Sequence, residues 1–224
     1  MGAPRIRRPD AAAVAALADR IRREAIVGRR FVLGIAGCPG SGKTTLGGAL
    51  VAALGQRAVA LPMDGFHLAN RTLDALGRRD RKGAPDTFDA DGFVALLDRV
   101  RTQPDRAVFA PSFRREVDEP IAAEIAIGAR HDIVIAEGNY LLLGDAPWSA
   151  VLPLLDAAWF CDAPDEVRRT RLVDRHMRHG RSREAAVAWA RDVDERNASL
   201  IRPSSAHADV IVSGETAAVL EDRG

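Results

Sequence analysis

Lysine is almost missing from this 224-residue chain, which holds only Lys43 and Lys82 among its 32 lysine and arginine residues. The 31 acidic residues nearly balance this charge, so the net charge is +1. Proteins that bind nucleic acids usually carry an excess or a clustered patch of positive charge, and we therefore expect no nucleic-acid partner. Cysteine is also scarce, with Cys38 and Cys161 far apart in the sequence. This excludes a disulfide framework and a metal site built from closely spaced cysteines, while a single bridge between the two stays open.

Long apolar stretches are missing too. No segment approaches the roughly 18 consecutive apolar residues that mark a membrane-crossing helix. The arginines near the amino end, Arg5, Arg7 and Arg8, precede no apolar run of the kind found in secretory signals. We therefore expect no membrane partner and a cytoplasmic protein with reduced thiols. With 47% hydrophobic and 28% charged residues, the composition is typical of globular proteins, and the length favours one domain over residues 1–224.

Short apolar runs alternate with longer segments of helical character along the chain. Strands are predicted at 31–36, 57–61, 131–136, 157–161 and 208–212, with a shorter one at 108–110. Helices are predicted at 11–27 (within an N-terminal segment 1–28), 46–54, 91–101, 164–179 and 182–200. The region 111–128 is compatible with a small hairpin. This alternation predicts an α/β fold of three layers, with a mostly parallel sheet of about five strands between two layers of helices.

A glycine-rich loop follows the first predicted strand. Gly37–Thr44 fits the pattern G-x-x-x-x-G-K-[ST], which cradles phosphate groups with backbone N–H groups at the start of a helix. One of the two lysines falls in this loop, where Lys43 would reach the outer phosphates. We therefore predict purine nucleoside triphosphate binding and a P-loop NTPase fold. The expected binding residues are Gly37, Cys38, Pro39, Gly40, Ser41, Gly42, Lys43, Thr44 and Thr45, with the Thr44 hydroxyl also a ligand of Mg²⁺.

Such a loop occurs in GTPases, ATPase motors and kinases. A GTPase would carry the guanine-reading sequence N-K-x-D, which neither lysine supplies, and a motor normally has a longer chain with further motifs. A kinase needs a carboxylate for the metal, a base near the acceptor hydroxyl and cations over the transferred phosphoryl group. Glu137 and Asp64 end predicted strands and fit the first two roles. Arginines crowd residues 165–181, which we expect to form a helical lid, and Arg171 and Arg175 share one face of it.

Three further motifs follow the glycine-rich loop in order. They are Asp64-Gly65-Phe66-His67, then Lys82-Gly83-Ala84-Pro85 with Phe88-Asp89, and Asp132–Leu142. The ordered set resembles the P-loop kinases that include uridine kinase, bacterial-type pantothenate kinase and phosphoribulokinase, and it is most similar to small bacterial nucleoside/nucleotide or fructose-transport kinases. The resemblance covers Arg30 to Val212 and implies that Asp64 is the catalytic aspartate. It also implies a site for ATP and Mg²⁺ made by Lys43, Thr44 and Glu137, with Arg171 and Arg181 as lid arginines.

The acceptor side differs from each well-understood member of that group. Uridine kinases have Asp-Ser-Phe-Tyr where this chain has Asp64-Gly65-Phe66-His67, and the pantothenate kinase segment Tyr-Ser-His-x-x-Tyr-Asp is not kept at 111–118. The two arginines in 111–118 favour an anionic or polyhydroxyl acceptor. The residues expected to face the acceptor are Asp64, Phe66, His67, Lys82, Arg114, Asn139, Tyr140 and Asn197.

The predicted function is ATP-dependent transfer of the γ-phosphoryl group to a hydroxyl of a small metabolite. A sugar, a nucleoside and a pantothenate-like molecule all stay open as the acceptor. The predicted catalytic residues are Asp64, Lys43, Arg171 and Arg175. The alternative is a nucleotide-binding regulator or slow NTPase that has no metabolite acceptor. Related kinases often self-associate, so a homodimer is left open beside a monomer.

Overall fold

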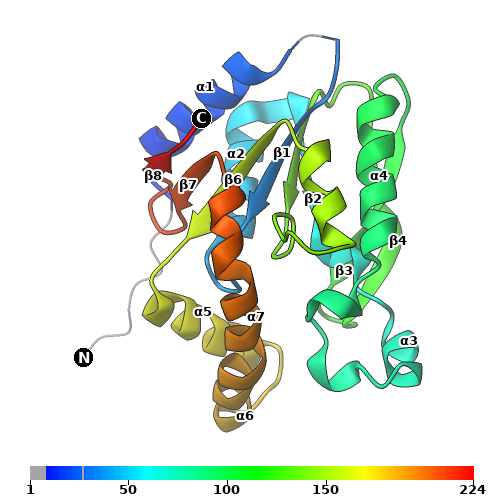
Figure 1. The fold of residues 1–224 in the computed structure, drawn as a ribbon, viewed down its shortest axis with the longest axis vertical. Coiled ribbons are helices and arrows are strands. Elements are labelled where there is room, and N and C mark those ends of the chain that lie inside the picture. The colour runs from blue at the N-terminus through cyan, green and yellow to red at the C-terminus, as the bar shows by residue number, and fades with distance from the viewer. Residues whose placement is uncertain (1–8, 27) are drawn as a thin grey trace.

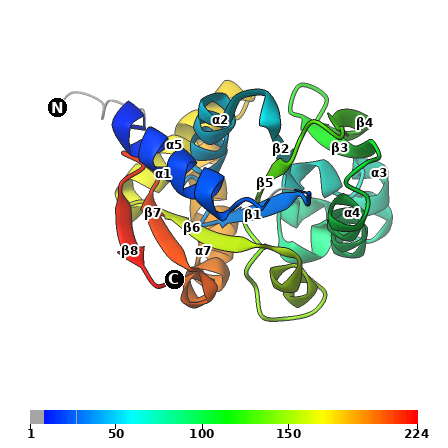
Figure 2. The same ribbon diagram turned by 90° about the horizontal axis from the view of Figure 1, so that it is seen from above.

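A central sheet of six strands organises the molecule (Figures 1 and 2). The computed structural model describes residues 9–26 and 28–224. The strands are β1 (Phe31–Ala36), β2 (Ala58–Pro62), β5 (Ile133–Glu137), β6 (Ala157–Asp162), β7 (Val210–Ser213) and β8 (Val219–Asp222), in the order β2-β5-β1-β6-β7-β8. All neighbours are parallel except β7 and β8. A separate hairpin pairs β3 (Val108–Arg114) with β4 (Glu119–Ile127).

Helices connect the strands and cover the sheet. They are α1 (Ala11–Glu24), α2 (Lys43–Leu54), α3 (Asn70–Ala75), α4 (Ala90–Thr102), α5 (Asp165–Arg178), α6 (Arg183–Trp189) and α7 (Glu195–Ile201), and a π-helical turn (Ala190–Asp194) joins the last two. Asp10, Asp89 and Ser182 cap α1, α4 and α6. Each of these side chains accepts a hydrogen bond from a backbone N–H that the first turn of a helix leaves unpaired.

The strands divide their side chains between two cores, as the two-residue period of a strand requires. Leu33 and Ile35 of β1 belong to the core formed with α1 and α2, whereas Val32 and Ala36 belong to the core formed with α4, the hairpin and α7. Every residue of β1 and of β5 is buried, which explains why both are continuous apolar runs in the sequence. Figure 2 shows α1 and α2 on one side of the sheet and α7 on the other.

The α/β class and the three layers are confirmed, with differences in detail. The sequence does not predict β8, because every residue of this edge strand is exposed and the strand forms no apolar run. The first helix ends at Glu24, short of the predicted boundary; Val27 and residues 1–8 of the predicted segment 1–28 lie outside the described residues. The helix predicted over 182–200 is interrupted by the π-helical turn. That residues 1–224 form one domain with a lid stays a prediction.

The carboxyl ends of the parallel strands meet at one edge of the sheet. In Figure 1, α5 and α6 project beyond this edge on one side, and α3 and the β3–β4 hairpin lie on the other. None of the helices within residues 9–26 and 28–224 has the length and apolar character needed to cross a membrane.

Candidate active site

A pocket of about 570 Å³ opens at the carboxyl ends of β1, β2 and β5. Ligands bind at this edge in open α/β sheets, because the loops that follow parallel strands gather there. The glycine-rich loop follows β1, Asp64 follows β2 and Glu137 ends β5, so motifs that are far apart in the sequence meet in one pocket. The β3–β4 hairpin and the segment from α5 to α7 supply the remaining lining residues.

The glycine-rich loop packs so closely on neighbouring backbone that a side chain at its start is excluded. A Cβ on Gly37 would lie 2.3 Å from the carbonyl oxygen of Cys161 in β6, and the φ of Gly37 is 152°, which side chains rarely allow. The turn after β2 is equally tight, since a Cβ on Gly65 would lie 2.3 Å from the carbonyl oxygen of Pro111 in β3. Glycine at position 65 therefore allows the hairpin to pack against the end of β2. The serine that uridine kinases have at this position would collide with the hairpin backbone.

The residues of the loop have different surroundings. Pro39, Gly40, Lys43 and Thr44 line the pocket. The thiol of Cys38 instead faces the backbone, 3.7 Å from the carbonyl oxygen of Ala198. Ser41 is fully buried, while Gly42 and the exposed Thr45 lie outside the pocket lining. The helix α2 begins at Lys43, directly after the loop, and a helix start of this kind offers unpaired backbone N–H groups to a phosphate.

Lys43 begins α2 with its side chain buried beside the loop. It is 7% exposed, and its Nζ donates a hydrogen bond to the carbonyl oxygen of Cys38 across 3.0 Å. Burial lowers the pKa of Lys43, and the negative charge of Glu137 opposes this effect. Within the part of the chain that the structure describes, that carbonyl is its one polar contact, so the ammonium group is available to an anion in the pocket.

Thr44 and Glu137 place two oxygen ligands side by side. The Thr44 hydroxyl donates a hydrogen bond to Oε1 of Glu137 across 3.0 Å. Burial, together with the negative charge of Asp64, raises the pKa of Glu137, and Lys43 works against this. No group of three or more His, Cys, Asp or Glu side chains in residues 9–26 and 28–224 is placed to hold a metal alone. A hydroxyl and a carboxylate fit Mg²⁺, which takes its other ligands from water and phosphate.

Asp64 lies in the pocket lining and forms an ion pair with Arg115. Its Oδ2 is 3.1 Å from Nη2 of Arg115, a residue in the turn of the β3–β4 hairpin. Burial works against the charged carboxylate, but interaction with His67 and the positive charges of Arg115 and Arg175 outweigh it and hold the pKa of Asp64 below its usual range. The carboxylate is therefore ionised at neutral pH and able to accept a proton.

The three predicted lid arginines occupy different positions. Arg175 and Arg181 line the pocket, and the Arg181 guanidinium lies over the ring of Trp189, 3.9 Å from its centre. Burial lowers the pKa of Arg175, for which the described residues offer no hydrogen-bond or ion-pair partner. Arg171 instead donates hydrogen bonds to backbone carbonyl oxygens, those of Gly40, Ser41 and Gly214. This placement favours a role for Arg171 in holding the loop rather than in the chemistry.

Five of the predicted acceptor-side residues line the pocket, namely Asp64, His67, Lys82, Asn139 and Asn197. The Lys82 ammonium lies 2.6 Å from Oδ1 of Asn70 and 3.0 Å from Oδ2 of Asp118. The His67 ring packs against Phe88 and Phe113, with ring centres 4.0 and 4.7 Å away. Two aromatic faces and several fixed polar groups therefore surround the space next to Asp64.

The other three predicted acceptor-side residues lie outside the pocket. Phe66 is buried in the core with its ring edge-to-face with that of Phe93. Tyr140 is fully buried, and its hydroxyl donates a hydrogen bond to the carbonyl oxygen of Gly83. Arg114 is exposed and forms an ion pair with Glu124. The prediction that these three residues line the pocket is therefore wrong. Phe66 and Tyr140 belong to the buried core, and Arg114 is exposed on the hairpin.

Several lining residues are absent from the predicted set. Phe113, Arg115 and Asp118 come from the hairpin, and Arg79 comes from the loop between α3 and α4. The segment from α5 to α7 adds His176, His179, Trp189 and Asp194. The neighbouring arginines at 114 and 115 are a signal in the sequence, but strand register decides which one faces the pocket. For Asp194 the sequence offers no signal, because its position depends on the π-helical turn that ends there.

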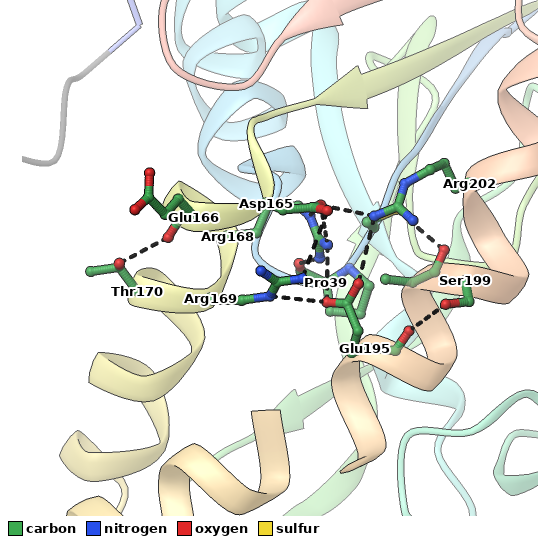
Figure 3. A network of polar contacts seen from close by, with 11 residues as sticks. Pro39, Asp165, Glu166, Arg168, Arg169, Thr170, Glu195, Ser199 and Arg202 are labelled. Carbon is green, nitrogen blue, oxygen red and sulfur yellow. Dashed lines mark hydrogen bonds and ion pairs between the residues drawn. The ribbon is translucent and has the colours of Figure 1, made fainter. Parts of the chain in front are cut away.

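A buried arginine, Arg168 of α5, connects the glycine-rich loop to α7 (Figure 3). Arg168 is 1% exposed, and its Nη1 donates a hydrogen bond to the carbonyl oxygen of Pro39 across 2.9 Å. Its Nη2 contacts Oδ1 of Asp165 at 2.6 Å and Oε2 of Glu195 at 3.3 Å. Arg202 reaches the same Asp165 oxygen at 2.8 Å. The loop that would hold phosphate is thus fixed to both helices that close the pocket.

Replacement of Arg168 by methionine is expected to lower the free energy of unfolding by about 2–3 kcal/mol, because the Pro39 carbonyl loses its partner in a buried setting. Arg169 is the matched control, since it contacts the same two acids but is 54% exposed. Arg169→Met is expected to cost less than about 1 kcal/mol. Urea denaturation of both variants measures the difference, and equal losses would contradict the assigned importance of the Pro39 contact.

Comparisons with known proteins agree on one family. Residues 32–219 match the phosphoribulokinase / uridine kinase family. A Schizosaccharomyces pombe protein named "Putative uridine kinase C227.14" is 33% identical over 195 residues, covering 82% of this chain and 83% of its own. An Aspergillus versicolor protein named "ATP-dependent kinase-like protein notR'" is 35% identical over 170 residues, covering 72% of this chain and 99% of its own. The crystal structure of a "putative fructose transport system kinase" from Silicibacter sp. TM1040 is 38% identical with a TM-score of 0.79, covering 85% of this chain and 94% of that one.

The family match spans the glycine-rich loop, the Asp64 turn and Glu137, which are the motifs that carry the resemblance in the sequence. The structural similarity covers 85% of this chain, so it is not confined to one motif. Fold, motifs and relatives thus agree on a nucleotide-binding P-loop kinase, and the chain belongs to the phosphoribulokinase / uridine kinase family.

Proposed function

We propose that this kinase transfers the γ-phosphoryl group of ATP to a hydroxyl group of a small metabolite. The observation that carries the proposal is the meeting of Lys43, the Thr44–Glu137 pair and the Asp64 carboxylate in one pocket. They provide a cation for the outer phosphates, oxygen ligands for Mg²⁺ and an ionised base. Phosphoryl transfer to a hydroxyl needs these three parts, because its catalysis is mostly positioning and electrostatics.

In the proposed reaction, Asp64 accepts the proton of the acceptor hydroxyl while the hydroxyl oxygen forms a bond to the γ-phosphorus. The bond from that phosphorus to the oxygen bridging to the β-phosphate breaks, and its electron pair leaves with ADP. Lys43 and the N–H groups of the glycine-rich loop hold the phosphates. Thr44 and Glu137 would hold Mg²⁺, which when bound would offset part of the phosphate charge.

We assign the role of a lid to residues 165–181. Arg175 and Arg181 bring positive charge into the pocket from this segment, as stabilisation of a transferred phosphoryl group requires. The lid is linked to the π-helical turn by His176, whose Nε2 lies 2.7 Å from Oδ2 of Asp194. Closure over the nucleotide would exclude water and so suppress hydrolysis of ATP.

With a suitable acceptor, the purified protein with ATP and Mg²⁺ is expected to form ADP at about 1–100 per second, the usual range for kinases. A coupled assay of ADP against pools of sugars, sugar acids, nucleosides and vitamins measures this rate. Mass spectrometry of the active pool then identifies the acceptor that has gained a phosphoryl group. Tight ATP binding without turnover, or hydrolysis that no acceptor accelerates, would instead favour the nucleotide-binding regulator or slow NTPase.

A further inference from the structure

The carboxylate of Asp64 is held by a side chain that the proposed reaction does not use. Nη2 of Arg115 lies 3.1 Å from Oδ2 of Asp64, on the carboxylate that would accept the acceptor proton. The Arg115 side chain is 41% exposed, so it has room to turn away. An acceptor hydroxyl that binds Asp64 must share this carboxylate with Arg115 or displace it.

The surroundings of Arg115 make its displacement costly unless a new anion replaces Asp64. Arg175 lines the same pocket, and after burial the charge of Arg115 is the main cause that lowers the pKa of Arg175. The hairpin turn has two acids of its own: Glu116 is exposed and outside the pocket lining, and Asp118 is already shared by Lys82 at 3.0 Å and Arg79 at 3.2 Å. An Arg115 released from Asp64 would therefore still be repelled by the charge of Arg175 and would have lost its own acidic partner, which is unfavourable.

We infer that the acceptor carries an oxyanion, a carboxylate or a phosphate, close to the hydroxyl that receives the phosphoryl group. On binding, Arg115 exchanges the Asp64 carboxylate for this oxyanion. The inference rests on the proposed function. Arg115 stays protonated throughout, and the exchange of one anionic partner for another moves no proton. A guanidinium and a carboxylate or phosphate form strong charge-assisted hydrogen bonds, so the exchange costs little.

The exchange would also prepare Asp64 for its role as the base. In the ion pair, the charge of Arg115 helps to hold the pKa of Asp64 low, which makes the carboxylate a weak proton acceptor. When Arg115 turns to the oxyanion of the acceptor, this charge is partly neutralised and the basicity of Asp64 rises. A neutral acceptor gives no such effect, so the pair discriminates between acceptors by charge.

The hairpin turn is anchored so that the Arg115 side chain can move while its backbone stays in place. The Lys82 ammonium lies 2.6 Å from the carbonyl oxygen of Asp118, and the side-chain amide of Asn70 donates to the same oxygen at 3.0 Å. The backbone N–H of Asn70 donates to the Glu119 carboxylate at 3.0 Å. Lys82 thus positions the turn that presents Arg115.

The test compares pairs of related acceptors in which one member carries a carboxylate or phosphate and the other does not. Glycerate is paired with glycerol, gluconate with glucose, pantothenate with panthenol and ribose 5-phosphate with ribose, and ADP formation by the native protein is measured for each. In every pair that is turned over, kcat/KM is expected to be about 100-fold higher for the anionic member. The carboxylate pairs and the phosphate pair distinguish the two kinds of oxyanion.

Two neighbouring arginines provide the variant and its control. Arg115→Gln is expected to lower kcat/KM for the anionic acceptor about 100-fold, mainly through KM, and to leave the KM for ATP unchanged. Arg115→Lys is expected to recover part of this loss, since it restores charge without the planar guanidinium. Arg114→Gln removes the adjacent arginine, which is paired with Glu124 outside the pocket, and is expected to keep the native preference.

The outcomes separate the inference from the proposed function. Turnover of neutral acceptors as efficient as that of their anionic partners would overturn the inference and leave the kinase in place. Absence of acceptor-dependent turnover in all pairs would overturn the proposed function and the inference with it. Should Arg115→Gln fail to fold, the paired acceptors still decide the question with the native protein.

Discussion

The Asp64→Asn variant is expected to lose about 10³-fold in kcat with its acceptor, while its affinity for ATP stays within about threefold of the native value. Asparagine keeps the shape of the side chain and an oxygen that can accept from Arg115, so the pocket is expected to stay intact. The asparagine amide is not basic, so no side chain at this position can accept the proton of the acceptor hydroxyl. The loss therefore falls on the chemical step rather than on binding of the nucleotide. Initial rates of ADP formation measure kcat, and calorimetric titration with ATP measures affinity.

The matched control for this variant is Asp74→Asn on α3. Asp74 is a 64% exposed carboxylate, 4.0 Å from Arg79, and does not line the pocket. Its replacement is expected to leave kcat within about twofold, because an exposed ion pair contributes little. An Asp64→Asn protein that folds, binds ATP and keeps more than about a tenth of the native kcat would refute the role of Asp64 as the base.

The sequence predicts the nucleotide side of the pocket well, because that side is built mainly by backbone. The pattern Gly37–Thr44 requires glycine where backbone approaches backbone, as the 2.3 Å between a Cβ on Gly37 and the Cys161 carbonyl oxygen illustrates. Glu137 is equally visible in the sequence, since an acid that ends a continuous apolar run marks the carboxyl end of a buried strand. The need for glycine at a close backbone contact and for an acid at a strand end depends on neighbouring residues in the chain, so both can be recognised in a single sequence.

The acceptor side depends on register and packing, which a single sequence does not express. Between Arg114 and Arg115, the pairing of β3 with β4 decides which residue reaches Asp64, and an irregularity between Ala110 and Ser112 shifts that register. Alternation counted from the start of β3 therefore does not predict which side of the hairpin a residue at the end of the strand faces. The structure selects Arg115, and the inference about an anionic acceptor depends on that selection.

Aromatic residues beside a motif are ambiguous for a different reason. Tyr140 follows Glu137 and Asn139 closely, yet its ring packs against Phe88 and Trp148 in the core. The Tyr140 hydroxyl and the Asn197 side-chain amide both donate a hydrogen bond to the carbonyl oxygen of Gly83. Tyr140 therefore positions the loop that carries Lys82. A tyrosine that binds an acceptor and one that supports the loop under it have the same position in the sequence. Only tertiary contacts separate the two roles.

Replacing Lys43 by methionine is expected to reduce kcat/KM for ATP by at least about 10³-fold, since the outer phosphates lose their cation in a site shielded from water. The fold is expected to tolerate the change. Methionine has nearly the same length, and burial already disfavours the charged form of Lys43, as its lowered pKa indicates. The free energy of unfolding is therefore expected to stay within about 1 kcal/mol of the native value or to rise. Steady-state kinetics and urea denaturation measure the two effects separately.

The second lysine provides the contrast, because this chain has no others. Lys82→Met removes a charge that lies 3.0 Å from Asp118 on the acceptor side, so it is expected to raise the KM for the acceptor about tenfold and to leave the KM for ATP unchanged. The two variants thus divide the pocket into a nucleotide half and an acceptor half. If Lys82→Met weakened ATP as strongly as Lys43→Met does, the two halves would not be separate, and Lys82 would contact the nucleotide phosphates rather than hold the hairpin turn.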